Sequence, residues 1–186
     1  MSLKNNRKIA FLTAGGIAPC LSASIGALII EYVKKLPDVE MIGYSHGYKG
    51  LLLGNHIPIT EKVKQNANIL FDFGGSPIGN SRVKLTNTDD CVNRGFIKKG
   101  QDPLEVAAQQ LVKDNVSILH TIGGDDTNTM AASLVEILDK KGIELTVVGL
   151  PKTVDKENYP QYYLRNFHHQ TDGYLSDFSA SIYDLQ

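Results

Sequence analysis

Residues 116–128 read VSILHTIGGDDTN and join a short apolar run to two glycines and two aspartates. The run at 116–122 is typical of a buried strand that ends in a turn. Apolar residues at helical spacing then predict a helix over 127–141, with Gly142 as its stop signal. A strand that enters a helix through a glycine turn is the unit from which parallel α/β sheets are built.

Strands and helices alternate through the rest of the first 150 residues. Apolar runs predict further strands at 8–14, 39–44 and 145–150, and amphipathic spacing predicts a helix over 25–36. We therefore expect an α/β fold, a three-layer Rossmann-like domain with a mostly parallel sheet.

A further helix has the clearest start signal in the chain. Asp102 is placed to cap it, Pro103 occupies its first position, and Glu105 would complete a capping box. In contrast, four glycines between residues 43 and 54 predict a loop-rich stretch after the second strand.

Length and composition limit the class of protein. The chain has 186 residues, which suffices for one domain with a sizeable core. Its 19 basic and 20 acidic residues give a net charge of -1, so no basic surplus indicates a nucleic-acid or membrane partner. Two cysteines make no disulfide framework, and no apolar run is long enough for a secretory signal or a membrane span. We expect a cytoplasmic protein.

The composition changes near residue 158. The last 29 residues hold seven of the 14 aromatic residues but only one of the 17 glycines. We therefore predict a domain over residues 1–157 and a divergent, aromatic-rich tail over 158–186. Aromatic side chains favour burial, so we expect a homo-oligomer and consider the tail a candidate interface.

Two glycine-rich turns are candidates for phosphate binding. The backbone N–H groups of Gly15-Gly16 would suit a phosphate at the end of the first strand, although such pairs also close turns for conformational reasons alone. No Gly-Lys-Ser/Thr follows them, which excludes a Walker loop. The loop Gly74-Gly75-Ser76 leads to Arg82, whose forked guanidinium suits phosphate oxygens; without a partner motif it would be an ordinary surface loop.

Two other strand ends carry charged groups. Asp125 and Asp126 offer the carboxylate oxygens that Mg²⁺ takes together with water and phosphate; the alternative is a helix cap with a solvated neighbour. Lys152, Thr153 and Asp155 place a cation, a hydroxyl and a carboxylate in one loop. Phosphoryl transfer needs a cationic clamp and a base, and Lys152 and Asp155 are suited to these roles.

Five ordered motifs resemble the phosphofructokinase family, and specifically its diphosphate-dependent branch. The resemblance runs from residue 8 to about 157, and the motifs are TAGG (13–16), GYKGL (47–51), GGS (74–76), GGDDT (123–127) and GLPKTVD (149–155). It implies transfer of a phosphoryl group from diphosphate to the 1-hydroxyl of fructose 6-phosphate, a step of glycolysis, with Mg²⁺ as cofactor.

The resemblance also implies roles for individual residues. Asp155 would accept the proton of the attacking hydroxyl, and Lys152 would act with it in catalysis. The other implied roles are donor binding by Gly16, Arg82 and Asp126, Mg²⁺ binding by Asp125, and sugar-phosphate binding by Thr153, Val154 and Asp155.

The residues at two positions favour diphosphate over ATP. ATP-using members of the family have glycine where this chain has Asp126 and Lys152. A carboxylate 4 Å from the α-phosphate of ATP would cost about 4 kcal/mol at an effective dielectric of 20. Lys152 instead offers positive charge to a donor that lacks a nucleoside.

The chain departs from the family in two respects. The family continues as Asp-Asn-Asp where this chain has Asp155-Lys156-Glu157, which places a cation beside the expected base. Family members are about twice as long, and their second half supplies residues that hold fructose 6-phosphate. We therefore expect a truncated or fused form of such an enzyme, and the missing residues leave its activity alone as an open question. The alternatives are a non-catalytic remnant that binds diphosphate or serves as an oligomerisation partner, an ATP-dependent phosphofructokinase, and a NAD-kinase or lipid-kinase relative.

Overall fold

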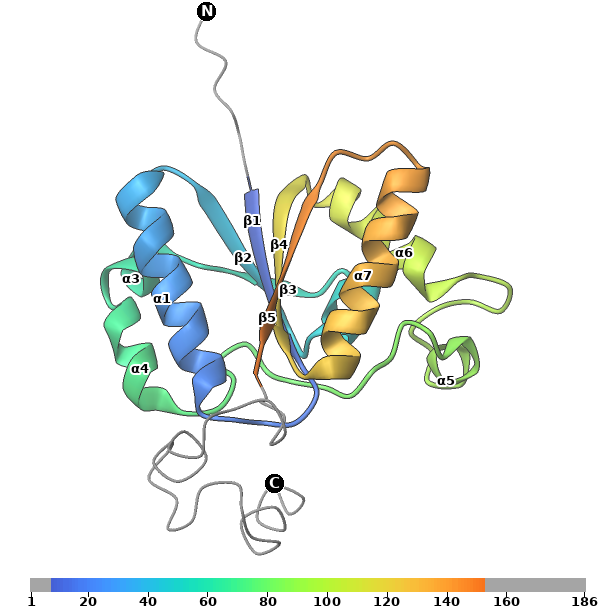
Figure 1. Ribbon diagram of the computed structural model, residues 1–186, viewed down its shortest axis with the longest axis horizontal. Helices are drawn as coiled ribbons and strands as arrows, with labels where there is room; N and C mark the ends of the chain where they lie inside the picture. Colours follow the sequence, from blue (N-terminus) through green and yellow to red (C-terminus); the bar gives the residue numbers. More distant parts are fainter. Residues whose placement is uncertain (1–7, 153–186) are drawn as a thin grey trace, which may run out of the picture.

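Strand β1 occupies the centre of a five-stranded sheet (Figure 1). The computed structural model describes residues 8–152, and within them the strand order is β3-β2-β1-β4-β5. Strand β3 is antiparallel to β2, and the other neighbouring pairs are parallel. The strands are β1 (Lys8–Ala14), β2 (Glu40–Tyr44), β3 (His56–Pro58), β4 (Val116–Gly123) and β5 (Thr146–Pro151).

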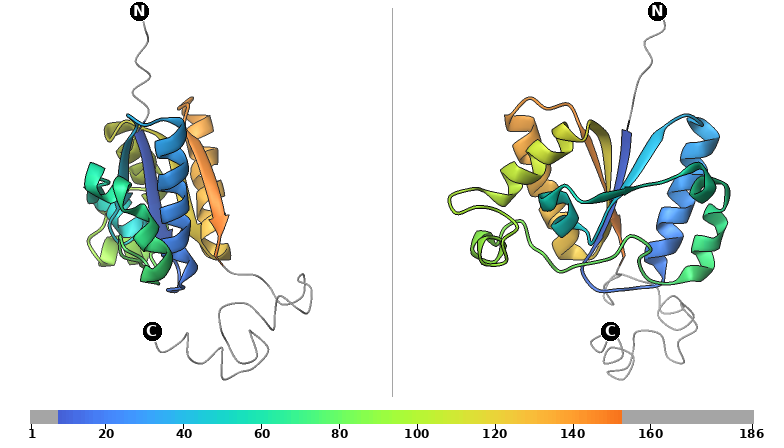
Figure 2. Two further views of the ribbon diagram at one scale, coloured as in Figure 1. Left: turned by 90° about the vertical axis from the view of Figure 1, so that its left-hand side faces the viewer. Right: turned by 180° about the vertical axis from the view of Figure 1, so that it is seen from behind.

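Helices cover both faces of the sheet (Figures 1 and 2). Helices α1, α3 and α4 lie on one face, and α2, α6 and α7 lie on the other (Figure 1). This three-layer, mostly parallel arrangement confirms the predicted fold class. The helices are α1 (Cys20–Lys35), α2 (Tyr48–Leu53), α3 (Glu61–Gln65), the 3-10 turn η1 (Ala67–Ile69), α4 (Leu70–Phe73), α5 (Thr88–Asn93), α6 (Pro103–Lys113) and α7 (Asp125–Lys140).

The core consists of two apolar clusters separated by the sheet. Ile9 and Phe11 of β1 belong to the cluster under α1, whereas Ala10 and Leu12 belong to the cluster under α6 and α7. Successive residues of a strand lie on opposite faces, so a strand covered on both sides is expected to be mostly apolar. This explains why the sequence at 8–14 shows a continuous apolar run. In the described part of the chain, no helix is both long and apolar enough to cross a membrane.

The start of α6 confirms one predicted cap and corrects another. Asp102 accepts a hydrogen bond from the amide of Leu104 at 2.9 Å, and Pro103 is the first helical residue, as predicted. The capping box, however, was wrong in its second half. Glu105 forms an ion pair with Lys141 at 3.3 Å, because the carboxylate lies within reach of the end of α7.

The stretch between residues 43 and 54 was also predicted incorrectly. It contains helix α2, although its glycines indicated a loop. Tyr48 and Leu51 are fully buried in the cluster shared with α6, and this burial stabilises a helix that local propensity disfavours. Helix α7 likewise begins at Asp125, two residues before its predicted start.

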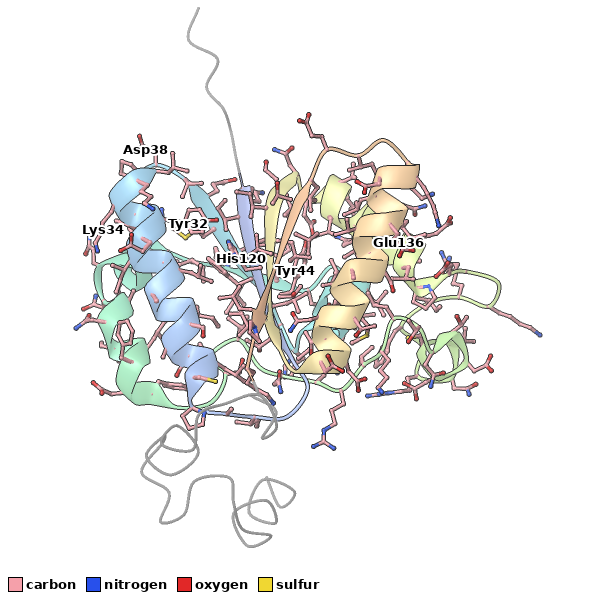
Figure 3. The ribbon with its side chains drawn as sticks, viewed as in Figure 1. Tyr32, Lys34, Asp38, Tyr44, His120 and Glu136 are labelled. Carbon is pink, nitrogen blue, oxygen red and sulfur yellow. The ribbon has the colours of Figure 1, made fainter. Side chains whose placement is uncertain are left out.

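A buried histidine interrupts the apolar surface beneath α1. His120 of β4 is 5% exposed, stacks on Phe11 with ring centroids 5.7 Å apart, and shares a 2.7 Å hydrogen bond with Tyr32 (Figure 3). Its Nδ1 atom has no hydrogen-bond partner within the described residues. Burial disfavours the charged ring and lowers the pKa of His120 to about 4.

We expect the pH dependence of stability below pH 6.5 to depend on His120. In the unfolded chain this ring titrates near pH 6.5, so between about pH 6.5 and 4 the unfolded state binds more protons than the folded state. The free energy of unfolding should therefore fall by up to about 3 kcal/mol as the pH is lowered from 6.5 to 4. Urea unfolding at several pH values should show a flatter profile for His120→Gln than for the unchanged chain. His56→Gln, at an exposed position, serves as the control; parallel profiles for His120→Gln and the unchanged chain would refute the assignment.

Candidate functional site

Three parallel strands end side by side at one edge of the sheet. Ala14 of β1 pairs with Gly123 of β4, and Gly123 pairs with Pro151 of β5. The turns that follow these residues surround a cavity of about 470 Å³. Residues 82–84, which are distant in sequence, complete its lining.

The Gly15-Gly16 turn forms one wall of the cavity. Gly15 has a φ of +88°, a conformation that favours glycine, and its amide donates to the carbonyl of Ser81 at 3.0 Å. Lys152 Nζ donates to the carbonyl of Gly16 at 2.7 Å, and a Cβ atom on Gly16 would lie 3.3 Å from that nitrogen. The turn is therefore held from both sides, and a side chain on Gly16 would press against the ammonium of the lysine.

The loop that carries Arg82 is anchored to the same turn. Thr13 Oγ1 lies 2.7 Å from Ser76 Oγ and donates to the carbonyl of Gly79 at 2.9 Å. The side-chain amide of Asn80 donates to the carbonyl of Gly15. Arg82, Val83 and Lys84 all line the cavity, and Val83 is fully buried while its two neighbours are exposed. Burial of Val83 thus determines where its two cationic neighbours lie.

The start of α7 brings the two carboxylates to the cavity. Gly124 is the N-cap, so neither aspartate caps the helix and the alternative interpretation of this pair was wrong. Tyr48 fixes this end of α7, because its hydroxyl donates to the carbonyl of Thr127 at 2.8 Å. Both aspartates are exposed, and Asp126 forms a 2.7 Å ion pair with Lys84.

Lys152 is the most constrained cation of the site. Its amide donates to the carbonyl of Gly123 at 2.7 Å, while its ammonium contacts Gly16. Burial lowers the pKa of Lys152; the nearby Cys20 opposes this shift and the positive charge of Arg82 adds to it. An anion at the cavity would stabilise the charged form of this amine.

The structure brings together five of the residues predicted from the sequence. Gly16, Arg82, Asp125, Asp126 and Lys152 line one cavity. Thr153, Val154 and Asp155, predicted to bind the sugar phosphate and accept a proton, lie outside the described residues, as does the predicted boundary at residue 157.

Lys84 and Met130 line the same cavity but were not predicted from the sequence. The apolar–charged–apolar order Val83-Lys84-Leu85 was the signal that could have identified Lys84. Its two neighbours are buried, and the lysine side chain lies on the opposite side of the backbone, toward the cavity.

The donor set fits a magnesium ion that is shared with a phosphate ligand. The carboxylate of Asp125 has no hydrogen-bond or ion-pair partner in residues 8–152, so its oxygens are available. The same residues contain no group of three or more acidic, histidine or cysteine side chains that could hold a metal. Mg²⁺ commonly binds one or two carboxylates together with phosphate oxygens and water, which is the arrangement that Asp125 permits.

Comparison with known proteins identifies the family. The family model described as Phosphofructokinase matches residues 8–160. The pyrophosphate–fructose 6-phosphate 1-phosphotransferase of Methylotuvimicrobium alcaliphilum is 60% identical over 154 residues, which cover 83% of this chain and 38% of that protein. The protein of the same name from Mastigamoeba balamuthi is 54% identical over the same shares.

A solved structure has the same fold. The crystal structure of the pyrophosphate-dependent phosphofructokinase from Marinobacter aquaeolei matches with a TM-score of 0.64 at 19% identity, covering 79% of this chain and 33% of that one. The chain thus spans well under half the length of the relatives that it matches. The match to the family model covers the whole described sheet and every cavity residue named above, and the chain belongs to the phosphofructokinase family.

Proposed function

We propose that this chain is the donor-binding part of a diphosphate–fructose-6-phosphate 1-phosphotransferase. The observation that carries the proposal is the cavity at the ends of β1, β4 and β5, where Arg82, Lys84 and Lys152 surround two carboxylates. A small anion with several phosphate oxygens and a bound Mg²⁺ matches this mixture of charges. The names of the relatives at 54–60% identity support the choice of substrates.

The chain's own residues would hold and orient diphosphate. The guanidinium of Arg82 can donate two parallel hydrogen bonds to phosphate oxygens, and the ammonium of Lys152 can exchange the carbonyl of Gly16 for a charged acceptor. Asp125 would hold Mg²⁺, which neutralises charge on the phosphate oxygens when bound. These groups would keep the donor in line with the attacking oxygen.

The proposed reaction transfers one phosphoryl group. Asp155 would take the proton of the 1-hydroxyl of fructose 6-phosphate as the hydroxyl oxygen forms a bond to one phosphorus of diphosphate. The bond from that phosphorus to the bridging oxygen breaks, and inorganic phosphate leaves. Contacts from Thr153 and Val154 would hold the sugar phosphate. The resemblance to the family supports the roles of these three residues.

The structure refines the argument on donor choice. Asp126 is 71% exposed and paired with Lys84, so its repulsion of an α-phosphate is weaker than the about 4 kcal/mol of an unpaired charge at 4 Å. Lys152 favours the binding of diphosphate, because it adds positive charge to a partly buried wall of the cavity. We therefore expect donor selectivity to need both residues.

Cytoplasmic location, a homo-oligomeric state and the division at residue 157 stay predictions. A coupled assay with fructose 6-phosphate, Mg²⁺ and either diphosphate or ATP tests whether the chain is active alone. Turnover would support the enzyme, whereas diphosphate binding without turnover would support the non-catalytic remnant.

We expect the chain to bind diphosphate in the presence of Mg²⁺, and Lys152→Met to weaken this binding at least about tenfold. The reason is that a hydrogen bond to a charged group contributes about 1.5–3 kcal/mol. Isothermal titration calorimetry with inorganic diphosphate measures the Kd directly. Lys140→Met, in the last turn of α7 at the other edge of the sheet, should bind like the unchanged chain. Absence of binding by the unchanged chain would contradict the proposed function.

We expect the double variant Asp126→Gly, Lys152→Gly to bind diphosphate more weakly and to gain measurable binding of ATP with Mg²⁺. It removes the carboxylate that opposes an α-phosphate and the cation that favours diphosphate, and it leaves Lys84 without its partner. Titration of each donor into the same preparation compares the two affinities. If the ratio of the two Kd values stayed that of the unchanged chain, these residues would not determine donor choice.

A further inference from the structure

The backbone of His46 has a conformation that residues other than glycine rarely adopt. Its φ is +63°, and within residues 8–152 Asn115 is the other non-glycine residue with a positive φ. This conformation brings Cβ close to the backbone; Asn, Asp and His adopt it more often than other side chains, and Asn and Asp can also form local hydrogen bonds there. His46 is also exposed, so burial of its own ring does not compensate for the strain. A strained residue that contacts a segment leading to the cavity is a candidate for a functional role.

The contacts of His46 converge on one short segment. Its amide donates to the carbonyl of Ile78 at 3.0 Å, and its carbonyl accepts a hydrogen bond from Ser81 Oγ at 2.6 Å. Its ring covers Gly79: a Cβ atom built on that glycine would lie 3.0–3.2 Å from three ring atoms. His46 therefore contacts both ends of segment 78–81 and fills the space beside its glycine.

Segment 78–81 connects His46 to the cavity. The carbonyl of Ser81 accepts the amide of Gly15, and the next residue, Arg82, lines the cavity. Gly79 has a φ of +77° and no side chain of its own to restrict it. A flat ring against this glycine limits the conformations of the segment. Arg82 would then be ordered before an anion arrives, which lowers the entropy cost of binding.

We propose that His46 is a positioning residue for the donor cavity: its ring, held over Gly79 by a strained backbone, keeps segment 78–81 and Arg82 in the conformation that binds the anion. The nature of that anion, diphosphate, rests on the proposed function. His46 acts through Arg82 and needs no contact with the ligand. This role depends on the flat shape of the ring and not on its charge. The ring of phenylalanine, which does not titrate, should therefore replace that of histidine.

Two substitutions separate positioning from stability. His46→Asn removes the ring and suits a positive φ, so the melting temperature should stay equal or rise. The Kd for inorganic diphosphate with Mg²⁺ should nevertheless rise about five- to tenfold, because Arg82 must be ordered during binding. His46→Phe keeps a flat ring at the cost of strain. It should lower the melting temperature but retain the Kd of the unchanged chain.

Two further variants locate the effect. Asn115→Gly changes the other positive-φ position, between α6 and the amino end of β4, and should leave the Kd unchanged. In an Arg82→Ala background, His46→Asn should produce no additional loss of binding, because the route through Arg82 is already removed. If His46→Asn weakened diphosphate binding as much in the Arg82→Ala background as in the unchanged chain, the proposal would be overturned.

Amide hydrogen exchange tests the inference without any ligand. We expect faster exchange at residues 79–82 in His46→Asn than in the unchanged chain, and no such change in His46→Phe. Unchanged exchange in His46→Asn would overturn the positioning role, whether or not diphosphate binds. If exchange changes as expected but the unchanged chain binds no diphosphate, the positioning role is supported and the proposed function fails.

Discussion

The register of three parallel strands determines where every group of the cavity lies. Because Ala14, Gly123 and Pro151 are paired across β1, β4 and β5, the three strands end at the same level. The residues after them emerge next to one another, although the first of these turns is more than a hundred positions from the other two in sequence. A one-residue slip would exchange the two faces of a strand, and the apolar clusters on both sides of the sheet oppose it.

Close contact between backbones turns this edge of the sheet into a rigid frame. A Cβ atom on Gly123 would collide with Thr127 and with the carbonyl of Ala14, so strand, turn and helix can approach only at a glycine. The hydroxyl of Tyr48 then fixes the first turn of α7 through Thr127. Asp125, Asp126 and Lys152 therefore extend from closely packed backbone.

The charges of the cavity contribute little to folding. In the ion pair between Lys84 and Asp126, the lysine side chain is 50% exposed and the aspartate side chain 71% exposed. Such surface pairs contribute about 0–1 kcal/mol to stability. The role proposed for these two charges, together with Arg82 and Lys152, is to bind an anion that carries a metal ion. The role proposed for His46 is to order Arg82, and this role does not depend on the charge of the histidine ring.

The sequence by itself determined the fold class and most of the charged groups of the cavity. Mostly apolar runs at 8–14 and 116–122, each closed by glycines, favour strands covered on both faces, and the glycines and charges at their ends mark the ligand edge. Only the tertiary structure decided that Lys84 joins Asp126, that Glu105 pairs with Lys141, and that His46 covers Gly79. These contacts join residues far apart in the chain, and local pattern carries no information on which distant side chains the packing of the sheet brings together.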